Sequence, residues 1–385
     1  MRLAFYSHDT MGLGHVRRNL AIARSLLAAH GGTALLVTGT REATAFPLPP
    51  GCECLSLPSL MKDDDGCYRS RSLDVSLDEI IAVRGGAIRA ALASYAPDVL
   101  VVDKAPRGVH GELAPALELL RRRGTTHCVL GLRDVLDDPA TVDREWCAED
   151  NGAFVDRHYD AIWVYGDPNV CDPIRTHAAL GRLRAPVTYT GYLCPERAVR
   201  PTRAHADHAI HALCLVGGGQ DGAALARAFA RCRFADGDSG TIVAGPFMPE
   251  SECLEVESRA AGPEGPRVSR FVADPAPLIE RATHVVAMGG YNTVCELLCS
   301  ESRTLVVPRV VPRREQAIRA ERLQALGLLD VLPLERLSAH AIDAWLRDDP
   351  PRCTAARIDR SGLTRLPELV AELTGVGLAR ARACS

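Results

Sequence analysis

Lysine, long apolar runs and paired cysteines are all scarce in this sequence. Lys62 and Lys104 are the only lysines, so nearly all of the 45 basic residues are arginines, and these are spread along the chain. With a formal net charge of -3, this distribution argues against nucleic acid as a main partner. No apolar run approaches the ~20 residues that a membrane-spanning helix needs, so no transmembrane segment is expected.

The 14 cysteines do not form a metal-binding or redox motif, because no Cys-x-x-Cys pair occurs among them. The N-terminal stretch MRLAFYSHDT leads directly into a predicted strand and has neither the charged segment nor the long apolar segment of a signal peptide. We therefore expect a cytoplasmic protein whose cysteines are reduced and packed in its interior.

The length of 385 residues exceeds what one hydrophobic core usually serves, so two domains are expected. Short apolar runs alternate with segments of helical periodicity, and the aperiodic segment CPERAVRPTRAHADHAI interrupts this alternation. We predict a first domain over residues 1–196 and a second over 197–385, with a last helix that is free to pack back on the first domain.

The apolar runs are continuous rather than alternating, which indicates strands buried on both faces and therefore parallel sheets covered by helices. The face of the first predicted helix that packs on the sheet is marked by apolar residues at helical spacing, namely Val16, Leu20, Ala23 and Leu27. The predicted strands are residues 2–7, 33–39, 52–58, 98–103, 126–132, 161–166 and 187–192 in the first half, and 211–218, 240–246, 267–272, 283–290, 304–309 and 328–333 in the second. The predicted fold class is α/β, with two doubly wound Rossmann-like domains facing each other across a ligand-binding cleft.

A first glycine-rich turn, HDTMGLGHVRRN, follows the first predicted strand. Gly12 and Gly14 have the spacing of a dinucleotide fingerprint, but Arg17 stands where the third glycine is required. The turn therefore argues against a nicotinamide cofactor.

Two further glycine-rich turns follow strands of the second half. LVGGGQDGAAL places Gly218, Gly219 and Gln220 where a strand feeds a helix, and free N–H groups there suit an anion, although three glycines also make a tight turn. MGGYNTVCELL contains the second such turn, in which glycines let a phosphate approach the backbone.

In this last stretch, Asn292 and Thr293 supply donors, and Glu296 lies one helical turn beyond Asn292. A carboxylate at that point suits the paired hydroxyls of a ribose. The alternative is a glutamate that only stabilises the helix dipole.

The segment from RVSRFV through MGGYNTVCELL to PRREQAIRAERLQALG resembles the donor-nucleotide region of two-Rossmann-domain (GT-B) glycosyltransferases of the MurG-like family. The likeness covers roughly residues 205 to 330. PDVLVVDKAPRGVHGEL and VLGLRDVLDDP resemble an uncharacterised bacterial branch of predicted glycosyltransferases.

The resemblance implies a role for each matching residue. Gly218 and Gly219, with Gln220 beside them, match the loop near the donor diphosphate, and Phe271 and Val272 match the segment that lines the base. Gly290, Asn292 and Thr293 match the phosphate turn, Glu296 matches the ribose-binding glutamate, and Glu315 and Gln316 match the pair that holds the sugar hydroxyls. Two positions depart from relatives, because Met288 replaces a phosphate-contacting histidine and Arg319 replaces an asparagine.

Catalysis is expected from the first domain. His15 follows the GLG turn, and a histidine suits a general base that deprotonates an acceptor hydroxyl, the role assigned to the matching histidine in relatives; the alternative is a capping or packing histidine. Asp103, at the end of a strand, is the predicted carboxylate that orients it. Gly12, Gly14, Asp9 and Asp134 are predicted on the acceptor side, and His8 and Glu112 lie at loops of the same edge.

No metal site is predicted. The acidic run at residues 63–65 lies in a polar loop, and the spaced histidines 205, 208 and 211 lie in the linker without companion ligands. A helix dipole and N–H donors can neutralise a leaving diphosphate, so neither a metal nor a cofactor is required.

The sequence thus predicts a metal-independent glycosyltransferase that moves a sugar from a nucleoside-diphosphate sugar to a small-molecule acceptor, in natural-product or cell-envelope glycoside biosynthesis, as a monomer or homodimer. Two alternatives stay open, a nucleotide-sugar 2-epimerase or hydrolase of the same fold and a non-catalytic nucleotide-sugar binding protein.

Overall fold

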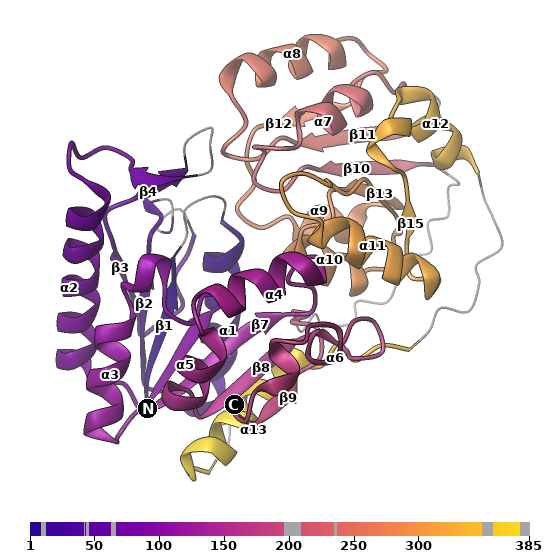
Figure 1. The fold of residues 1–385 in the computed structure, drawn as a ribbon. Helices are drawn as coiled ribbons and strands as arrows, with labels where there is room; N and C mark the ends of the chain where they lie inside the picture. The colour runs from indigo at the N-terminus through magenta and orange to yellow at the C-terminus, as the bar shows by residue number, and fades with distance from the viewer. Residues whose placement is uncertain are drawn as a thin grey trace, which may run out of the picture. The chain divides into compact units, whose positions relative to one another are not determined.

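The computed structural model describes residues 1–8, 13–41, 43, 46–62, 67–195, 209–234, 237–348 and 357–377. The chain divides into two compact units (Figure 1). The first contains Met1–Pro168, Asp172–Leu193 and the C-terminal segment that starts at Ser361; the second contains Asn169–Cys171 and Cys194–Arg360. The sequence places the boundary at residues 196 and 197, whereas the chain leaves the first unit at Leu193 and returns to it at Ser361.

The first unit is built on a seven-stranded sheet in the order β3-β2-β1-β6-β7-β8-β9. Its strands are β1 (Arg2–Ser7), β2 (Thr33–Thr38), β3 (Cys52–Ser56), β6 (Val99–Asp103), β7 (His127–Arg133), β8 (Ala161–Tyr165) and β9 (Val187–Tyr189), and all pair in parallel. A separate antiparallel hairpin joins β4 (Leu60–Lys62) to β5 (Tyr68–Ser70).

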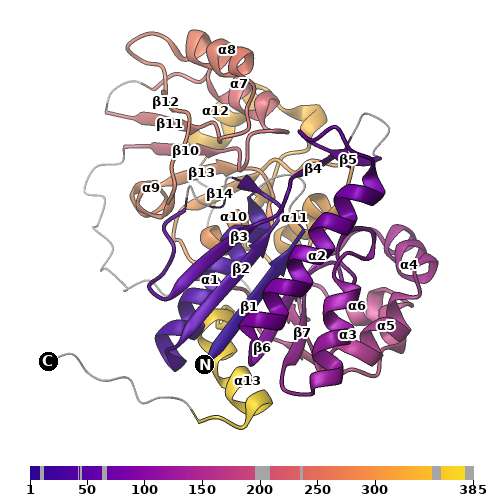
Figure 2. The same ribbon diagram turned by 90° about the vertical axis from the view of Figure 1, so that its left-hand side faces the viewer.

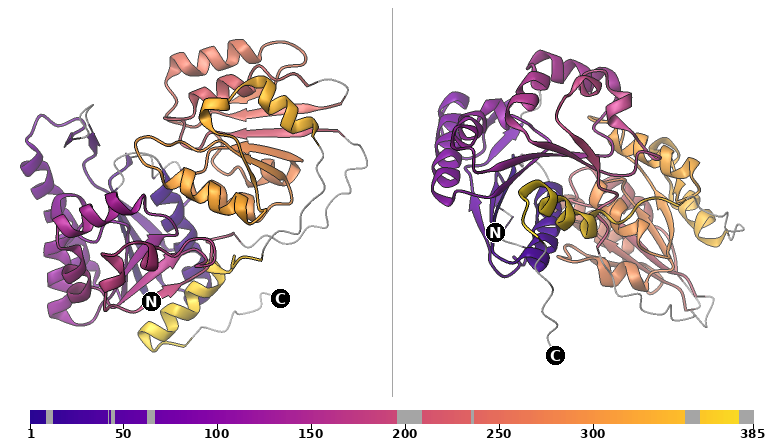
Figure 3. Two further views of the ribbon diagram at one scale, coloured as in Figure 1. Left: turned by 45° about the vertical axis from the view of Figure 1, so that its right-hand side comes forward. Right: turned by 90° about the horizontal axis from the view of Figure 1, so that it is seen from below.

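Helices cover both faces of this sheet. They are α1 (Gly14–His30), α2 (Leu77–Tyr95), α3 (Ala114–Arg123), α4 (Pro139–Ala148), α5 (Asn151–His158), α6 (Pro173–Thr176) and α13 (Gly362–Thr374), with 3-10 turns η2 (Val109–Gly111) and η3 (Leu180–Arg182). Residues of α2, α3 and α5 form one core with the sheet. The helices α1 and α13 pack together on the opposite face (Figures 2 and 3).

The second unit has a six-stranded parallel sheet in the order β12-β11-β10-β13-β14-β15. Its strands are β10 (His211–Leu215), β11 (Ser239–Val243), β12 (Arg267–Ser269), β13 (His284–Ala287), β14 (Arg303–Val306) and β15 (Asp330–Val331). Its helices are α7 (Ala223–Phe229), α8 (Glu250–Ala260), α9 (Ala276–Arg281), α10 (Tyr291–Leu298), α11 (Glu315–Ala325) and α12 (Ala339–Arg347), with a 3-10 turn η4 (Leu334–Arg336).

Alternate residues of one strand belong to two different cores. Cys214 of β10 packs with residues of α7, α8 and α12, whereas Leu213 and Leu215 pack with Ile279 of α9 and Leu297 of α10. Burial on both faces explains why the strands are apolar without alternation.

The prediction of two doubly wound α/β domains is confirmed. Every predicted strand exists, although most end one to several residues earlier than predicted. The β4–β5 hairpin was not predicted, because its strands are short and partly exposed. The prediction that Leu27 lies on the buried face of α1 is wrong. Leu27 is only partly buried, and the adjacent Leu26 is buried instead. That the two domains face each other across a cleft stays a prediction.

Within the described residues, no helix is both long and apolar enough to cross a membrane.

Candidate functional site

Each sheet has one point where the strand order reverses, and ligands of doubly wound folds bind beyond the carboxyl ends of the strands at that point. In the first unit, the reversal lies between β1 and β6, and in the second it lies between β10 and β13. The three glycine-rich turns follow β1, β10 and β13. The fold therefore brings the predicted site residues of each unit to the edge of its sheet where a ligand is expected.

In the first unit, His15 lies against the predicted carboxylate. His15 belongs to the first turn of α1, which follows β1, and Asp103 is the last residue of β6, which pairs with β1. His15 Nδ1 is 2.9 Å from Asp103 Oδ2. The His15 side chain is 16% exposed, whereas Asp103 is fully buried, so the carboxylate holds the ring from the protein interior.

Arg18 completes this cluster, and the sequence analysis did not predict it. Its Nη2 donates to Asp103 Oδ1 at 2.8 Å and to Oδ2 at 2.5 Å, and its Nε donates to Oδ2 at 3.1 Å. Burial opposes ionisation of Asp103, but Arg18 and then His15 outweigh it and hold the pKa of this carboxyl well below its usual range. Three residues separate His15 from Arg18, which places both on one face of α1, but this spacing alone did not single out Arg18 among the arginines of the helix.

The position of the proton on His15 decides what the imidazole can do. Nδ1 lies 2.9 Å from Asp103 Oδ2 and also 2.9 Å from Arg18 Nη2. An N–H at Nδ1 can donate to Asp103, and Nε2 is then left with a lone pair that can accept a proton. Among the described residues, Nε2 has no hydrogen-bond partner. This tautomer has the form of a base oriented by a carboxylate.

His8, at the end of β1, is the neighbour of this cluster. Its ring centroid lies 5.2 Å from that of His15, and its Nδ1 is buried without a hydrogen-bond partner in the described part of the chain. Burial, followed by the charges of His15 and Lys104, lowers the pKa of His8 well below its ordinary value. His8 is thus a poorer proton acceptor than a histidine paired with a carboxylate.

Glu112 belongs to a buried structural network. Both of its oxygens accept from Arg84, and Tyr6 Oη donates to Oε1 at 2.5 Å. Glu112 and Arg84 are almost fully buried. Their ion pair joins the segment before α3 to helix α2, and this leaves the carboxylate unsuited to act as a base.

Asp134, which follows β7, is fully buried. Its Oδ1 accepts from the Val135 N–H at 2.7 Å, and its Oδ2 accepts from Tyr192 Oη at 2.9 Å. The structure therefore gives this carboxylate internal partners, and its contact with an acceptor stays a prediction. Gly14 is exposed at the start of α1, whereas Asp9, Gly12 and the aspartates 63–65 lie outside the described residues.

A cavity of about 350 Å³ opens in the first unit where β2 and β3 end. Its lining includes Arg41, Ser59, Ser70 and Leu73, so a bound molecule would meet both hydroxyl groups and apolar surface. Since β2 pairs in parallel with β1, this cavity lies on the same edge of the sheet as His15.

In the second unit, the glycines after β10 serve different purposes. Gly219 has a φ of 95°, and a Cβ there would lie 2.6 Å from the carbonyl oxygen of Ala244, so only glycine fits. A Cβ at Gly218 would meet only Phe247, at 3.5 Å, which is an ordinary contact. Gln220 is exposed at the same turn.

The turn after β13 leads into α10 without a side-chain cap. Gly290 is the N-cap residue with extended backbone angles, it makes no side-chain cap hydrogen bond, and a Cβ at Gly290 would meet open space. Nothing steric thus requires glycine, whereas serine or aspartate would cap the helix better. Asn292 is partly exposed, and Thr293 and Glu296 are each 8% exposed.

Two arginines lie at this edge, and neither was assigned a role from the sequence. Arg319 is fully buried and donates to the carbonyl oxygen of Gly289 at 3.1 Å, so it holds the turn that precedes α10. Arg309 donates to Glu315 at 2.7 Å and to Asp221 at 2.6 Å. Gln316 Oε1 accepts from the Arg309 backbone N–H at 3.4 Å.

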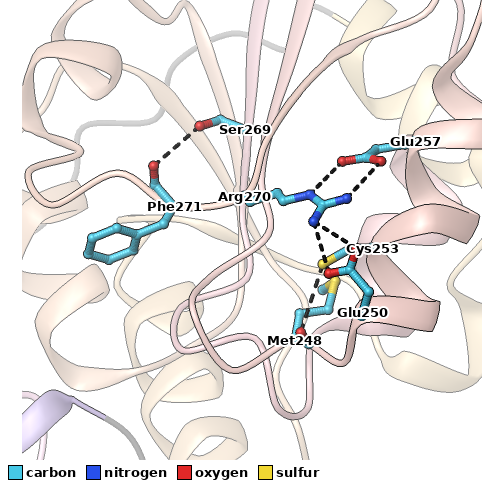
Figure 4. A network of polar contacts seen from close by, with 7 residues as sticks. All are labelled: Met248, Glu250, Cys253, Glu257, Ser269, Arg270 and Phe271. Atoms are coloured by element: carbon cyan, nitrogen blue, oxygen red, sulfur yellow. Dashed lines mark hydrogen bonds and ion pairs between the residues drawn. The ribbon is translucent and has the colours of Figure 1, made fainter. Parts of the chain in front are cut away.

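Phe271 and Val272 follow β12. Phe271 is 39% exposed, and its ring points away from the neighbouring Arg270, which pairs with Glu250 and Glu257 of α8 (Figure 4). Val272 packs partly on the core below. An exposed aromatic ring beside an anchored arginine is suited to stack on a nucleobase.

The described residues contain no cluster of three or more His, Cys, Asp or Glu side chains that could hold a metal ion.

No protein-family model matches the sequence, and no curated protein matches it. Solved structures do. The glycosyltransferase VinC in complex with dTDP has a TM-score of 0.59 at 13% identity, covering 98% of this chain and 100% of that chain. MurG of Acinetobacter baumannii has a TM-score of 0.55 at 14% identity, covering 99% and 96%.

A UDP-glucose:anthocyanidin 3-O-glucosyltransferase in complex with UDP has a TM-score of 0.55 at 12% identity, covering 98% of this chain and 95% of that chain. At such identities, the likeness establishes the fold. The chain has the two-domain fold of these proteins, the GT-B fold, as the sequence predicted.

Proposed function

We propose that this GT-B chain is a glycosyltransferase that moves a sugar from a nucleoside-diphosphate sugar to a hydroxyl group of a small acceptor, without a metal ion and in the cytoplasm. The observation that carries the proposal is the uncapped turn at Gly290. This turn places a helix N-terminus whose N-cap glycine has no side chain at the reversal point of a doubly wound sheet, with the buried Glu296 on the same helix.

The donor is assigned to the second unit. The N–H groups at the start of α10 and the turn at Gly218 and Gly219 bind the diphosphate, and Glu296 accepts hydrogen bonds from the ribose hydroxyls. Phe271 and Val272 line the base, while Glu315 and Gln316 hold the sugar. The fold supports this assignment, because VinC and the anthocyanidin enzyme are described in complex with dTDP and UDP.

The proton transfer is assigned to the first unit. His15 Nε2 removes the proton of the acceptor hydroxyl, the acceptor oxygen attacks the anomeric carbon, and the electron pair of the broken C–O bond leaves with the diphosphate. Asp103 stabilises the imidazolium that forms, and Arg18 keeps Asp103 ionised. The cavity near Ser59 and Arg41 is the proposed place of the acceptor.

The test is product analysis by mass spectrometry. The protein is incubated with UDP-, dTDP- and GDP-sugars, first with a pool of hydroxyl acceptors and then with water alone. We expect a glycoside and free nucleoside diphosphate with the pool, and little release with water alone. Equal release in both conditions would identify a hydrolase, an altered sugar would identify an epimerase, and binding without any conversion would identify a binding protein.

A further inference from the structure

Arg309 connects two loops at the carboxyl edge of the second unit's sheet. Its Nη1 donates to Asp221 Oδ2 at 2.6 Å, and its Nη2 donates to Glu315 Oε1 at 2.7 Å. Asp221 lies in the loop after β10, whereas Glu315 is the first residue of α11, which follows β14. A single guanidinium thus bridges the loops of two strands.

The strand between these two is β13, whose carboxyl end continues into the turn at Gly289 and Gly290. The Arg309 bridge therefore joins the loops that follow the two neighbours of β13 in the sheet. The start of α11 is close to this turn as well, because a Cβ at Gly289 would lie 3.2 Å from Gln316 Cβ. The two ends of the Arg309 bridge thus lie in the loops on either side of the turn at Gly289 and Gly290, and Gln316, whose Oε1 accepts from the Arg309 backbone N–H, lies against that turn.

Arg309 has unused capacity to donate hydrogen bonds. Its side chain is 25% exposed, and its Nε is buried without a partner among the described residues. A guanidinium has five N–H donors, and only two of them are needed for the contacts to Asp221 and Glu315.

The two carboxylate partners of Arg309 differ in how firmly they hold it. Glu315 is 5% exposed, whereas Asp221 is 42% exposed. An ion pair with an exposed partner contributes little free energy, because water screens it and solvates the carboxylate when the pair opens. Arg309 can therefore give up Asp221 at small cost while Glu315 keeps it in place.

We propose that Arg309 is a ligand of the donor diphosphate. When no donor is bound, the carboxylate of Asp221 occupies the position on Arg309 that the diphosphate would take. The inference rests on the proposed function of this site. A guanidinium suits a phosphate group, since two parallel N–H donors match two phosphate oxygens. Negative charge on the diphosphate grows as the bond to the sugar breaks, so the same contact stabilises the leaving group.

The test is calorimetric titration of the full chain with UDP, dTDP and GDP, and with the matching nucleoside monophosphates. We expect Arg309→Gln to weaken diphosphate binding by roughly 10- to 100-fold, with a smaller effect on the monophosphates. We expect Asp221→Asn to have the opposite effect and to tighten diphosphate binding, because a competing anion is removed.

Arg227→Gln is the matched control. Arg227 lies in the same unit, is 30% exposed and is also paired with two carboxylates, Glu252 and Glu255, and its substitution should leave the affinities unchanged. Asp221→Asn tests the inference even if Arg309→Gln fails to fold.

Wild-type diphosphate affinity in Arg309→Gln would overturn the inference. A purely structural ion pair would do so as well, and it would be recognised by an equal loss of affinity in Arg309→Gln and Asp221→Asn. If none of the six nucleotides binds the wild-type protein, the proposed function fails, and this inference fails with it.

Discussion

At the scale of single residues, Asp103 illustrates how a charge is kept in the protein interior. Three N–H···O contacts from Arg18 and the 2.9 Å contact with His15 Nδ1 compensate for its complete burial. The sequence indicated His15 and Asp103 as a pair, because His15 follows the first strand, Asp103 ends another strand, and a carboxylate can orient a histidine base. It did not indicate Arg18, since a helix surface with several arginines offers no rule for which one turns inward.

The stability of the first unit should depend on the charge of Asp103. Its folded-state pKa is depressed, so the ionised form stabilises the fold above the ordinary carboxyl pKa of about 3.9, and this contribution is lost as the pH falls below that value. Asp103→Asn should lower the free energy of unfolding at pH 7 by roughly 3 to 5 kcal/mol, because the buried Arg18 loses the carboxylate charge with which it is paired.

Urea unfolding at pH 7 and at about pH 3 measures this effect. The difference between wild type and Asp103→Asn should shrink by about 1 kcal/mol at the lower pH. A difference that stays constant would show that Asp103 is not held ionised in the folded state.

His15→Ala separates chemistry from donor binding. Loss of a general base lowers kcat by ~10² to 10⁴. Nucleotide affinity should be unchanged, because the donor is assigned to the other unit. Steady-state kinetics with a hydroxyl acceptor and calorimetry with the nucleoside diphosphate measure the two quantities. Near wild-type turnover in the variant would make His15 a packing residue and leave Asp9 as the next base to test.

At the scale of elements, helix α10 lacks an N-cap side chain, although there is space for one at its start. Gly290 has the backbone angles of a capped helix start and open space for a side chain, yet no cap is present. Aspartate is among the best N-cap residues, so Gly290→Asp should leave the unfolding temperature equal or higher.

The same carboxylate would repel a phosphate from the N–H groups that it caps. Gly290→Asp should therefore weaken nucleoside-diphosphate binding by roughly 10-fold or more. Scanning calorimetry and titration calorimetry on one sample measure both effects, and Gly290→Ala serves as a control without charge. Unchanged affinity would place the diphosphate elsewhere.

Buried elements could be predicted from the sequence more completely than short or partly exposed ones. Buried strands were predictable, because β1 and β10 are short continuous apolar runs between turns. The β4–β5 hairpin was not, because its residues are partly exposed and only three residues form each strand. Leu26 and Leu27 are adjacent in sequence, so the periodicity of α1 alone did not decide which one faces the sheet.

At the scale of the whole molecule, the order of helices and strands could be predicted from the sequence, whereas contacts between residues far apart in the sequence could not. The alternation of strands and helices predicted two doubly wound α/β domains, and the resemblance around MGGYNTVCELL pointed to the GT-B fold and to the turn before α10. The bridge from Arg309 to Asp221 joins residues 88 positions apart, and no local pattern indicates such a pair.

Activity should survive removal of divalent cations. If N–H groups and Arg309 neutralise the diphosphate, transfer rates in excess EDTA should stay close to those of the untreated protein. Rates measured before chelation, after chelation and after addition of Mg²⁺ or Mn²⁺ test this. Complete loss that a divalent cation restores would contradict it and would direct attention to the aspartates at 63–65.

The most direct test of the central claim is transfer itself, measured by mass spectrometry with a nucleotide sugar labelled in its sugar. Wild-type protein is compared with His15→Ala and with Glu296→Ala, which lacks the carboxylate that we propose binds the ribose. The account predicts that label reaches a hydroxyl acceptor with release of nucleoside diphosphate in the wild type, that His15→Ala loses the rate but keeps donor affinity, and that Glu296→Ala loses affinity. No transfer from any UDP-, dTDP- or GDP-sugar to any hydroxyl acceptor, or equal transfer by all three proteins, would contradict it.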